Sequence, residues 1–400
     1  MFNVNKKGVF SVSANKISWF QDVRLAIMKV TNRCNISCEY CYARAHSKGQ
    51  DMSADLFCDI AHDVIVSTKS DKIRFLLHGG EPTLLSKKWY IKVLSFLRKV
   101  GKSYSKDIIV SMQTNLIKIN IDKLLLLKKY NVRISGSLDD PTNDVLRMRP
   151  KSQDAIKTLL MAKKLGIHIG ILMNLNPLNL NKVDQMCHWI YDNLKKKYFK
   201  LNIMHSVGTG DKLLTLSADE IFDSQKKVIE YMIQTGGQAT LEKNLAEEVY
   251  RYFQAYVFKR SLKSNSLCDG IFCRAGTKVL SFDASGNIFP CGRCDCNNIK
   301  QSIGCYQEYF NLKRSEKELF FKQIKEFHCK NNEIWRSCYK CHARYICGYG
   351  CKAFILRSNS LINIECEPTL KRFDFYQKNI DRLGELYQSI VDYSAIMSSE

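Results

Sequence analysis

Short apolar segments alternate with amphipathic ones through the first half of this 400-residue chain. Six of them are rich in β-branched residues and predict strands, at residues 25–31, 73–78, 108–113, 132–138, 167–173 and 199–205. Between them apolar residues recur every three or four positions, which predicts helices at residues 53–68, 87–99, 121–129, 152–165 and 182–195. Ser53 and Ser152 are expected N-caps, and Gly166 is an expected helix end. The alternation predicts an α/β fold with helices covering a parallel sheet, either a barrel or an open doubly wound sheet.

The strand–helix alternation stops near Ser217, and the second half of the chain has a different pattern. Residues 217–234 and 241–263 predict two charged helices that connect two domains, and residues 369–393 predict one amphipathic helix. A hairpin is expected at residues 278–290, around the turn residues Asp283 to Gly286. We therefore expect an N-terminal segment (1–22), a barrel (23–216), a helical connection (217–265), a cysteine-rich domain (266–370) and a C-terminal helix (371–400).

Cysteine is the unusual component of the composition, with 17 residues, of which 12 lie between Cys268 and Cys366. The total is well below the roughly 8–10% of a secreted disulfide scaffold, and an odd count argues against complete pairing. The first 21 residues lack the apolar core of a signal peptide, and no stretch of about 18 apolar residues predicts a membrane span. We therefore expect a cytoplasmic protein whose clustered cysteines bind metal.

The net charge of +22 implies attraction to an acidic partner, such as nucleic acid, a membrane surface or an acidic peptide. A solvated basic surface is the alternative, and the cations are scattered along the chain rather than gathered in one tail.

The first predicted strand is followed directly by Cys34, Cys38 and Cys41, spaced C-x3-C-x2-C. Thiolates are soft ligands that suit iron–sulfur clusters, and three of them leave one corner of a four-iron cluster open to a small molecule. Three unligated thiols, or a zinc site that borrows a fourth ligand, are the alternatives. At the carboxyl end of a strand, where active groups collect, the iron–sulfur interpretation is favoured.

This segment, with Tyr40 before the third cysteine, resembles the radical S-adenosylmethionine (SAM) superfamily. The resemblance implies a partial (β/α)6 barrel and a [4Fe–4S] cluster on Cys34, Cys38 and Cys41. It also implies that SAM binds the open iron and is cleaved reductively to a 5′-deoxyadenosyl radical, which abstracts a hydrogen atom from the substrate.

Further residues extend the resemblance to the ends of the next strands. The segment Gly79-Gly80-Glu81 matches a family motif that approaches the SAM amino group, and a carboxylate suits an ammonium. Gln113 and Asn115 match a family TNG motif, with Leu116 in place of its glycine. The resemblance implies SAM contacts from Ser135, Ser137 and Arg147. Arg149 is an alternative to Arg147.

The second cysteine-rich region contains Cys338-x2-Cys341-x5-Cys347-x3-Cys351. Spacing alone admits a zinc ribbon. The arrangement resembles the SPASM domain of radical SAM enzymes that modify peptides and proteins, which implies two auxiliary [4Fe–4S] clusters. The implied ligands of the first are Cys268, Cys273, Cys291 and Cys351, and those of the second are Cys338, Cys341, Cys347 and Cys366. Cys294 and Cys296 lie close enough to Cys291 in sequence to compete for the first cluster.

The combined resemblance implies a radical SAM/SPASM maturase that cross-links a ribosomally made precursor peptide through a C–C, ether or thioether bond, as in antibiotic biosynthesis. The implied partners are a precursor with an acidic leader and an electron donor such as flavodoxin or ferredoxin, with no membrane and no specific nucleic acid. Formylglycine formation is one alternative, although Gly292 stands where sulfatase maturases often carry an acidic base, so that a base would have to come from elsewhere, for example Asp295. A small-molecule radical SAM enzyme, or a non-catalytic metalloprotein that binds nucleic acid, are the others.

Overall fold

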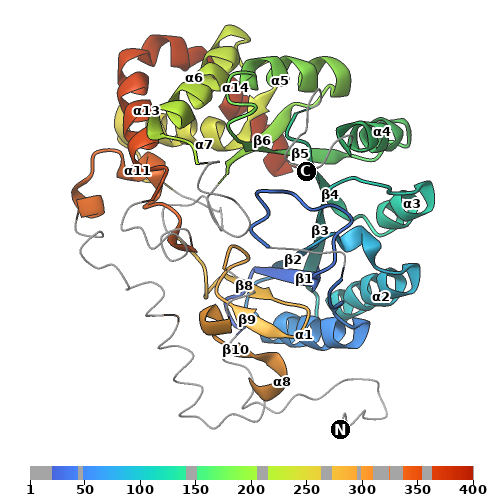
Figure 1. Cartoon of the computed structure of the whole chain (residues 1–400). Helices are drawn as coiled ribbons and strands as arrows, with labels where there is room; N and C mark the ends of the chain where they lie inside the picture. The colour runs from blue at the N-terminus through green and yellow to red at the C-terminus, as the bar shows by residue number, and fades with distance from the viewer. Residues whose placement is uncertain are drawn as a thin grey trace.

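Ten strands form one sheet in the order β10-β9-β8-β1-β2-β3-β4-β5-β6-β7 (Figure 1). The computed structural model describes residues 20–43, 48–140, 151–204, 215–262, 273–294, 299–309, 324, 337–353 and 363–399, and all statements below concern these residues. Strands β1 to β7 are parallel. The strands are β1 (Leu25–Thr31), β2 (Lys72–Gly79), β3 (Asp107–Thr114), β4 (Arg133–Ser137), β5 (Ile169–Leu175), β6 (Tyr198–Ile203), β7 (Leu241–Glu242), β8 (Val279–Phe282), β9 (Asn287–Phe289) and β10 (Gly304–Cys305).

Helices cover the outer face of this sheet and follow the strands in the expected alternation (Figure 1). Two of them, α5 and α7, end in π-helical turns, at Ile190–Leu194 and Phe253–Val257. The helices are α1 (Ala54–Ser67), α2 (Lys87–Ser103), α3 (Ile121–Lys129), α4 (Lys151–Lys164), α5 (Val183–Trp189), α6 (Ala218–Gln234), α7 (Lys243–Tyr252), α8 (Tyr306–Tyr309), α11 (Arg344–Cys347), α13 (Cys366–Lys378) and α14 (Ile380–Ser399). The predicted α/β fold with six parallel strands, β1 to β6, is confirmed.

Two of the three predicted helix boundaries are correct. The Ser53 hydroxyl accepts a hydrogen bond from the Leu56 amide at 3.1 Å, as an N-cap does. Gly166 follows α4 with a φ of +64°, a conformation that favours glycine. Ser152 is not an N-cap, because α4 already begins at Lys151.

Three features of the second half differ from the expectation. The segment expected to be one helix from residue 241 begins as strand β7, because the Leu241 amide pairs with the Lys197 carbonyl beside β6. The C-terminal helix is two helices, α13 and α14, because Asn379 leaves the helical region with a φ of −127°. Strand β8 pairs in parallel with β1, so the sheet continues from the barrel into the cysteine-rich region across the expected boundary at residue 266.

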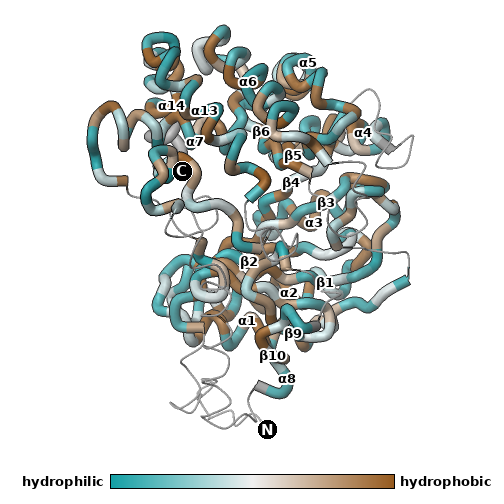
Figure 2. Tube along the Cα trace, turned by 60° about the vertical axis from the view of Figure 1, so that its left-hand side comes forward, coloured by the Kyte–Doolittle hydropathy of each residue, from teal (hydrophilic) through white to brown (hydrophobic). Residues whose placement is uncertain are grey.

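The two faces of the barrel strands differ in character, which decides where a site can form. Side chains that face the helices are apolar and fully buried, such as Met28, Phe75 and Met112, and hydrophobic segments of the chain lie along the strands in Figure 2. The alternate positions, which face the interior, carry Lys29, His78, Gln113, Ser137, Asn174 and Lys200. A polar inner face is consistent with a cavity rather than a packed core. In the described part of the chain no helix is long and apolar enough to cross a membrane.

Candidate active site

One cavity of about 500 Å³ is lined by both cysteine-rich segments of the chain. Its walls come from the loop after β1, from the ends of β2 to β6, and from the segments around β8 and α11. The residues expected to bind SAM or clusters that line it are Cys34, Cys38, Tyr40, Cys41, Gly79, Gly80, Gln113, Asn115, Ser137, Cys273, Cys291, Cys347 and Cys351. The carboxyl ends of parallel strands and the second cysteine region therefore meet in one space.

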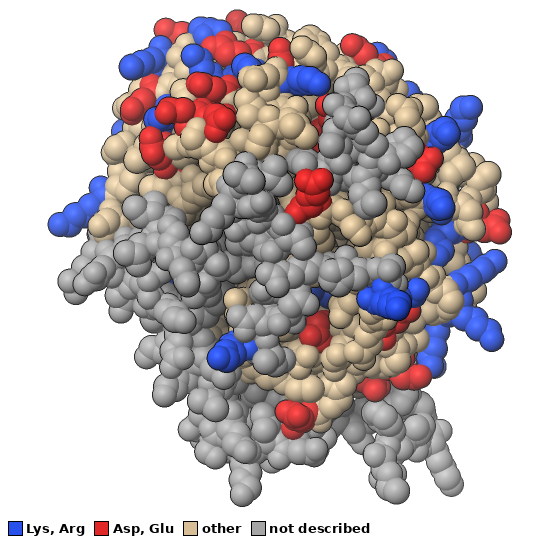
Figure 3. Space-filling view, viewed as in Figure 1, with Lys and Arg blue, Asp and Glu red and all other residues tan. Residues whose placement is uncertain are grey.

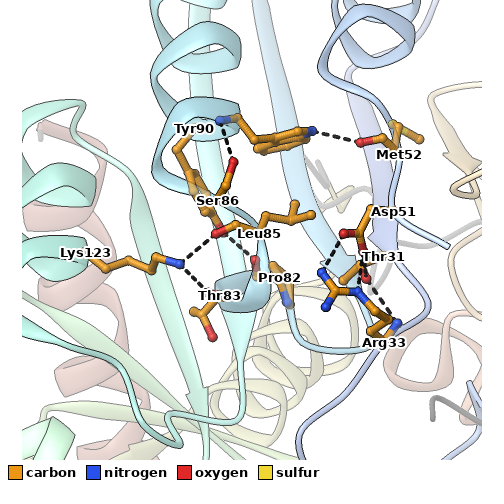
Figure 4. Close-up of polar contacts among 11 residues, drawn as sticks. Thr31, Arg33, Asp51, Met52, Pro82, Thr83, Leu85, Ser86, Tyr90 and Lys123 are labelled. Carbon is orange, nitrogen blue, oxygen red and sulfur yellow. Dashed lines mark hydrogen bonds and ion pairs between the residues drawn. The ribbon is translucent and has the colours of Figure 1, made fainter. Parts of the chain in front are cut away.

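The loop that carries Cys34, Cys38 and Cys41 is anchored at its start by an ion pair (Figure 4). The Arg33 guanidinium donates to both carboxylate oxygens of Asp51, at 2.9 and 2.5 Å, and the Thr31 hydroxyl donates to the same carboxylate at 2.6 Å. This contact lowers the pKa of Asp51 against the opposing effect of its partial burial. The loop therefore leaves β1 in a defined direction.

The glycines of the Gly79-Gly80-Glu81 motif allow close contact with this loop. The Gly80 amide donates to the Thr31 carbonyl and the Glu81 amide to the Arg33 carbonyl, both at 2.7 Å. A Cβ at Gly79, whose φ is +117°, would lie 2.3 Å from the Thr31 carbonyl oxygen. Glycine is therefore required at position 79 by both conformation and space.

The Glu81 carboxylate is fully buried and turned toward the chain itself rather than into the cavity. It accepts hydrogen bonds from the Thr83 amide (2.9 Å) and hydroxyl (2.6 Å), the Thr114 hydroxyl (2.8 Å) and the Asn115 amide (2.7 Å). Burial raises its pKa and these hydrogen bonds oppose the rise. Glu81 thus ties the end of β2 to the end of β3, while Gly79 and Gly80 contribute to the cavity wall.

The turn after Glu81 is held from the helix side (Figure 4). The Lys123 ammonium of α3 donates to the Thr83 carbonyl and, at 2.8 Å, to the Leu85 carbonyl. The Tyr90 hydroxyl of α2 donates to the Pro82 carbonyl at 2.7 Å. Both helices therefore fix the turn that presents Glu81.

Asn115 links β3 to the cysteine loop. Its side-chain amide donates to the Asn35 side chain at 2.7 Å and approaches the Cys34 sulfur at 3.7 Å. Leu116, in place of the family glycine, adopts a φ of +65° and is fully buried. A Cβ at Gly136 of β4 would lie 2.2 Å from a Leu116 methyl group, so a glycine on the neighbouring strand gives the leucine its space.

Tyr40 joins the cysteine loop to the next two strands. Its hydroxyl donates to the Asp139 carboxylate, which follows β4 and is 2% exposed. Asp139 also accepts from the Asn174 backbone amide of β5 at 3.0 Å. Ser137 lines the cavity at the end of β4, whereas Ser135 lies deeper along the same strand beside Gly170.

Lys29 of β1 and His78 of β2 are neighbours in the sheet, and they differ in charge. The Lys29 ammonium, 3% exposed, donates to the Cys294 carbonyl at 3.2 Å. The His78 ring accepts from the Gly79 amide at 2.7 Å, and burial together with the Lys29 charge lowers its pKa to about 4. His78 therefore enters the cavity wall as a neutral ring.

The thiols of the second region fall into two groups. Cys273, Cys291 and Cys351 pack against a small buried cluster that includes Cys294, and the Arg293 amide and guanidinium approach Cys291 and Cys351 at 3.5 and 3.9 Å. In the other group burial raises the pKa of Cys347 to about 12, and the neighbouring Cys366 adds to the rise. Burial also raises the pKa values of Cys338 and Cys366, again with contributions from the other thiols, including Cys341.

These thiols suit an iron–sulfur cluster by their chemistry. Each group gathers several soft donors whose ionised forms repel one another, and a cationic cluster relieves that repulsion. The Cys34 thiol has the same property, because burial, Glu81 and Cys41 raise its pKa. Across the described ranges no three His, Cys, Asp or Glu side chains are arranged to hold a single metal ion. The structure therefore supports cluster binding only through the closeness and the burial of the thiols.

Five residues expected in the site or named as competitors for it lie outside the described residues: Arg147, Arg149, Cys268, Asp295 and Cys296. Several residues of the site were not expected from the sequence. Four of them belong to no motif: Lys29, His78, Asp139 and Asn174. The strand pattern could have indicated them, because each lies on the inward-facing side of a strand or just after its end. Glu242 is another, a fully buried carboxylate in the cavity wall whose pKa burial raises to about 7.

Asp139 and its neighbour Asp140 provide a matched pair of test positions. Asp140 is also buried and pairs with Lys182 at 3.7 Å. We expect Asp139→Asn to weaken SAM binding about tenfold, because the cysteine loop loses a charge-assisted hydrogen bond of roughly 1.5–3 kcal/mol. Isothermal titration with SAM measures this, and Tyr40→Phe should give the same loss and add little to Asp139→Asn. An equal loss in Asp140→Asn would show that the effect is general destabilisation.

Comparison with known proteins agrees with this geometry. Residues 28–190 match the sequence model of the Radical SAM superfamily. The chain is 22% identical over 355 residues to a cysteine-type anaerobic sulfatase-maturating enzyme of Clostridium perfringens, covering 82% of this chain and 88% of that one. It is 24% identical over 276 residues to the antilisterial bacteriocin subtilosin biosynthesis protein AlbA of Bacillus subtilis, covering 66% and 54% of the two chains.

Solved structures share the fold over most of the chain. The structure of native anSMEcpe with bound AdoMet and Cp18Cys peptide superposes with a TM-score of 0.69 at 17% identity, covering 92% of this chain and 99% of that one. Streptococcus suis SuiB bound to precursor peptide SuiA gives 0.58 at 17%, covering 86% and 75%. Residues 28–190 thus form a radical SAM domain, and such a domain implies SAM and a [4Fe–4S] cluster.

Proposed function

We propose that this chain is a radical SAM maturase that modifies a ribosomally made precursor peptide. The observation that carries the proposal is the single cavity shared by the thiols after β1 and those of the second cysteine-rich region. Its volume of about 500 Å³ fits a small molecule as well as part of a peptide, so the choice of a peptide rests on the two cysteine-rich segments together with the likeness in fold. The likeness in fold to two structures that hold a bound peptide supports the same substrate class.

The residues of the chain supply binding, orientation and exclusion of water. Cys34, Cys38 and Cys41 would hold a [4Fe–4S] cluster, which when bound supplies an electron for reductive cleavage of SAM. Tyr40, Gln113 and Ser137 offer polar groups to the cosubstrate on the cavity wall, and Gly79 and Gly80 leave room for it. The loop itself is held by Asn115 on one side and Asp139 on the other.

The second region would hold two auxiliary clusters in a SPASM domain. For one, Cys338, Cys341, Cys347 and Cys366 are the ligands, and their mutual electrostatic coupling supports the grouping. For the other, Cys273, Cys291 and Cys351 are ligands with Cys268 as the fourth, and Cys294 is the competitor, because it belongs to the buried cluster against which these three pack. Reconstituted protein should contain about 12 irons per chain if all three clusters are four-iron. Loss of iron on Cys294→Ala but not on Cys268→Ala would assign the fourth position to Cys294.

A cross-link between side chains is the product we propose, rather than formylglycine. Gly292, which stands where a sulfatase maturase often carries its acidic base, lies against β1. A Cβ there would approach the Ile27 side chain at 2.9 Å, so an acidic residue at this position would require Ile27 to move. The relationship to the sulfatase-maturating enzyme keeps formylglycine as the second candidate.

Mass spectrometry of the modified peptide tests the proposal. A short precursor encoded beside this gene, incubated anaerobically with the enzyme, SAM and dithionite, should lose two hydrogen atoms per cross-link and yield a fragment that resists sequencing across the bond. A peptide in which a Cys or Ser has been converted to formylglycine, with its Cβ oxidised to an aldehyde, would favour the second candidate. Cys347→Ala should reduce product formation far more than SAM cleavage, and an equal loss of both would assign Cys347 a structural role.

A further inference from the structure

The amino ends of the barrel strands, opposite the cavity, carry a row of cations that the proposed chemistry does not use. We define this basic arc as six residues: Arg24, Arg74, Arg133, Lys163, Lys196 and Lys278. Arg24 and Lys278 directly precede β1 and β8, Arg133 begins β4, and Arg74 lies near the start of β2. Lys163 and Lys196 extend the arc to the end of α4 and the start of β6.

Backbone pairing brings these residues together. The Arg24 amide donates to the Lys278 carbonyl at 2.9 Å, and the Arg74 amide donates to the Arg24 carbonyl at 2.8 Å. Residue 109 of β3 pairs with Arg74 and residue 111 pairs with Arg133, so the two arginines are separated by one strand. The arc therefore follows the order of strands in the sheet.

The cations of the arc repel one another. Burial lowers the pKa of Arg74 and the charge of Arg133 lowers it further. Burial and the charge of Lys163 lower the pKa of Lys196. The charge of Arg24 lowers the pKa of Lys278. The acidic groups nearby are Asp22, whose charge acts on Lys278, and Asp71 and Asp107, which pair with Lys106 and Lys72. Among described residues, no carboxylate forms an ion pair with any of the six.

Helix polarity accounts for part of this arrangement, because the helices that precede β2, β4, β5 and β6 end on this side of the sheet. A lysine in the last turn of a helix, such as Lys163, stabilises the helix dipole and needs no further role. The other five cations instead lie at or near the starts of strands, which have little net dipole. On the face shown in Figure 3, Lys and Arg also predominate along the edge that α2 and α3 cover, whereas both signs are mixed over α6, α13 and α14. Solvent and salt screen part of this repulsion, and a bound anion would relieve it further.

We propose that the basic arc binds an acidic segment of the precursor peptide, an inference that rests on the proposed function. From β8 to β6 the arc crosses six inter-strand spacings, about 29 Å at roughly 4.8 Å each. An extended peptide of about nine residues covers that length. A protein electron donor fits this face less well, because the length of β1, about 23 Å, separates it from the cysteine loop.

This placement constrains the substrate. The modified residue must reach the cavity at the carboxyl ends of the strands while the acidic segment stays at their amino ends. At least about seven residues in extended conformation must separate the two, because they span the height of the sheet. A precursor with a shorter separation should bind but not react.

Fluorescence anisotropy with a labelled acidic peptide of about nine residues tests the inference on the full-length enzyme. Arg74→Glu with Arg133→Glu should weaken binding about tenfold or more, because reversing these two charges turns several favourable contacts of up to about 1 kcal/mol each into unfavourable ones. The matched control is Lys87→Glu with Lys88→Glu. It makes the same change in net charge at the amino end of α2, outside the basic arc. The control should bind within about twofold of the wild type.

Each other outcome has a defined meaning. Equal weakening by both double variants would overturn the inference, because it would show attraction by net charge alone. Tighter binding of an oligonucleotide of equal charge than of the peptide would also overturn it, in favour of nucleic acid. SAM cleavage with dithionite should be unchanged in Arg74→Glu with Arg133→Glu. If the wild type itself cleaved no SAM, the proposed function would fail while the binding result would still decide the inference.

Discussion

Replacing Gly79 by alanine should unfold or displace the start of the cysteine loop and abolish SAM cleavage. The new Cβ would lie 2.3 Å from the Thr31 carbonyl oxygen, a backbone atom that cannot rotate away. The φ of +117° adds conformational strain for any residue with a side chain. Together these effects should cost roughly 3 kcal/mol or more in unfolding free energy, measured by urea denaturation. The Gly80 and Glu81 amides would also lose their bonds to the loop.

Gly384 gives the matched control, because it lies in α14 and a Cβ there has open space around it. Gly384→Ala should stabilise the protein by about 0.5–1 kcal/mol through higher helix propensity and leave SAM cleavage intact. Wild-type stability and activity in Gly79→Ala would mean that the close contact between the motif and Thr31 does not exist.

Replacing Glu81 by alanine should have an effect of similar size for a different reason. Four buried donors, from Thr83, Thr114 and Asn115, would lose their acceptor. Each unsatisfied buried group costs about 1–3 kcal/mol, and partial relaxation should leave a total of roughly 3–5 kcal/mol. Because the Asn115 amide would be released, the Asn115 contacts to Asn35 and Cys34 should loosen, and SAM affinity should fall with stability.

Glu81→Gln separates charge from shape, since the amide keeps one acceptor oxygen but presents an NH2 group to another donor. The unfolding free energy of Glu81→Gln should lie between those of the wild type and Glu81→Ala. Glu385→Ala, at an exposed position on α14, should change the unfolding free energy by less than about 0.5 kcal/mol. A normal unfolding free energy in Glu81→Ala, together with lost SAM binding, would indicate that the carboxylate contacts SAM directly instead of holding β2 to β3.

The barrel strands were predictable because hydrophobic periodicity is a local property. The predicted strand at residues 25–31 coincides with β1, and the helix at residues 121–129 with α3. The strand β7 was missed because its two residues are paired by a tertiary contact with Lys197, which leaves no periodic pattern. The break at Asn379 was missed because the apolar spacing continues across it from α13 into α14.

Motifs located the cavity but did not give the roles of its residues. The glycine motif was expected to place a carboxylate against an ammonium, whereas Glu81 accepts four hydrogen bonds from its own chain. Asp139 became visible only in three dimensions, because its link to Tyr40 joins positions 99 residues apart. Leu116 shows the same limit, since the space for it is provided by Gly136 on another strand.

The measurement closest to the central claim is the yield of 5′-deoxyadenosine from anaerobically reconstituted protein with SAM and dithionite. The wild type should release it, and Cys34→Ala, Cys38→Ala and Cys41→Ala combined should release none while the auxiliary thiols still bind iron. Chromatography and an iron assay on the same samples give both quantities. Cleavage of SAM by the triple variant would contradict the assignment of these three thiols, and no cleavage by wild-type protein that holds its full iron would contradict the radical mechanism itself.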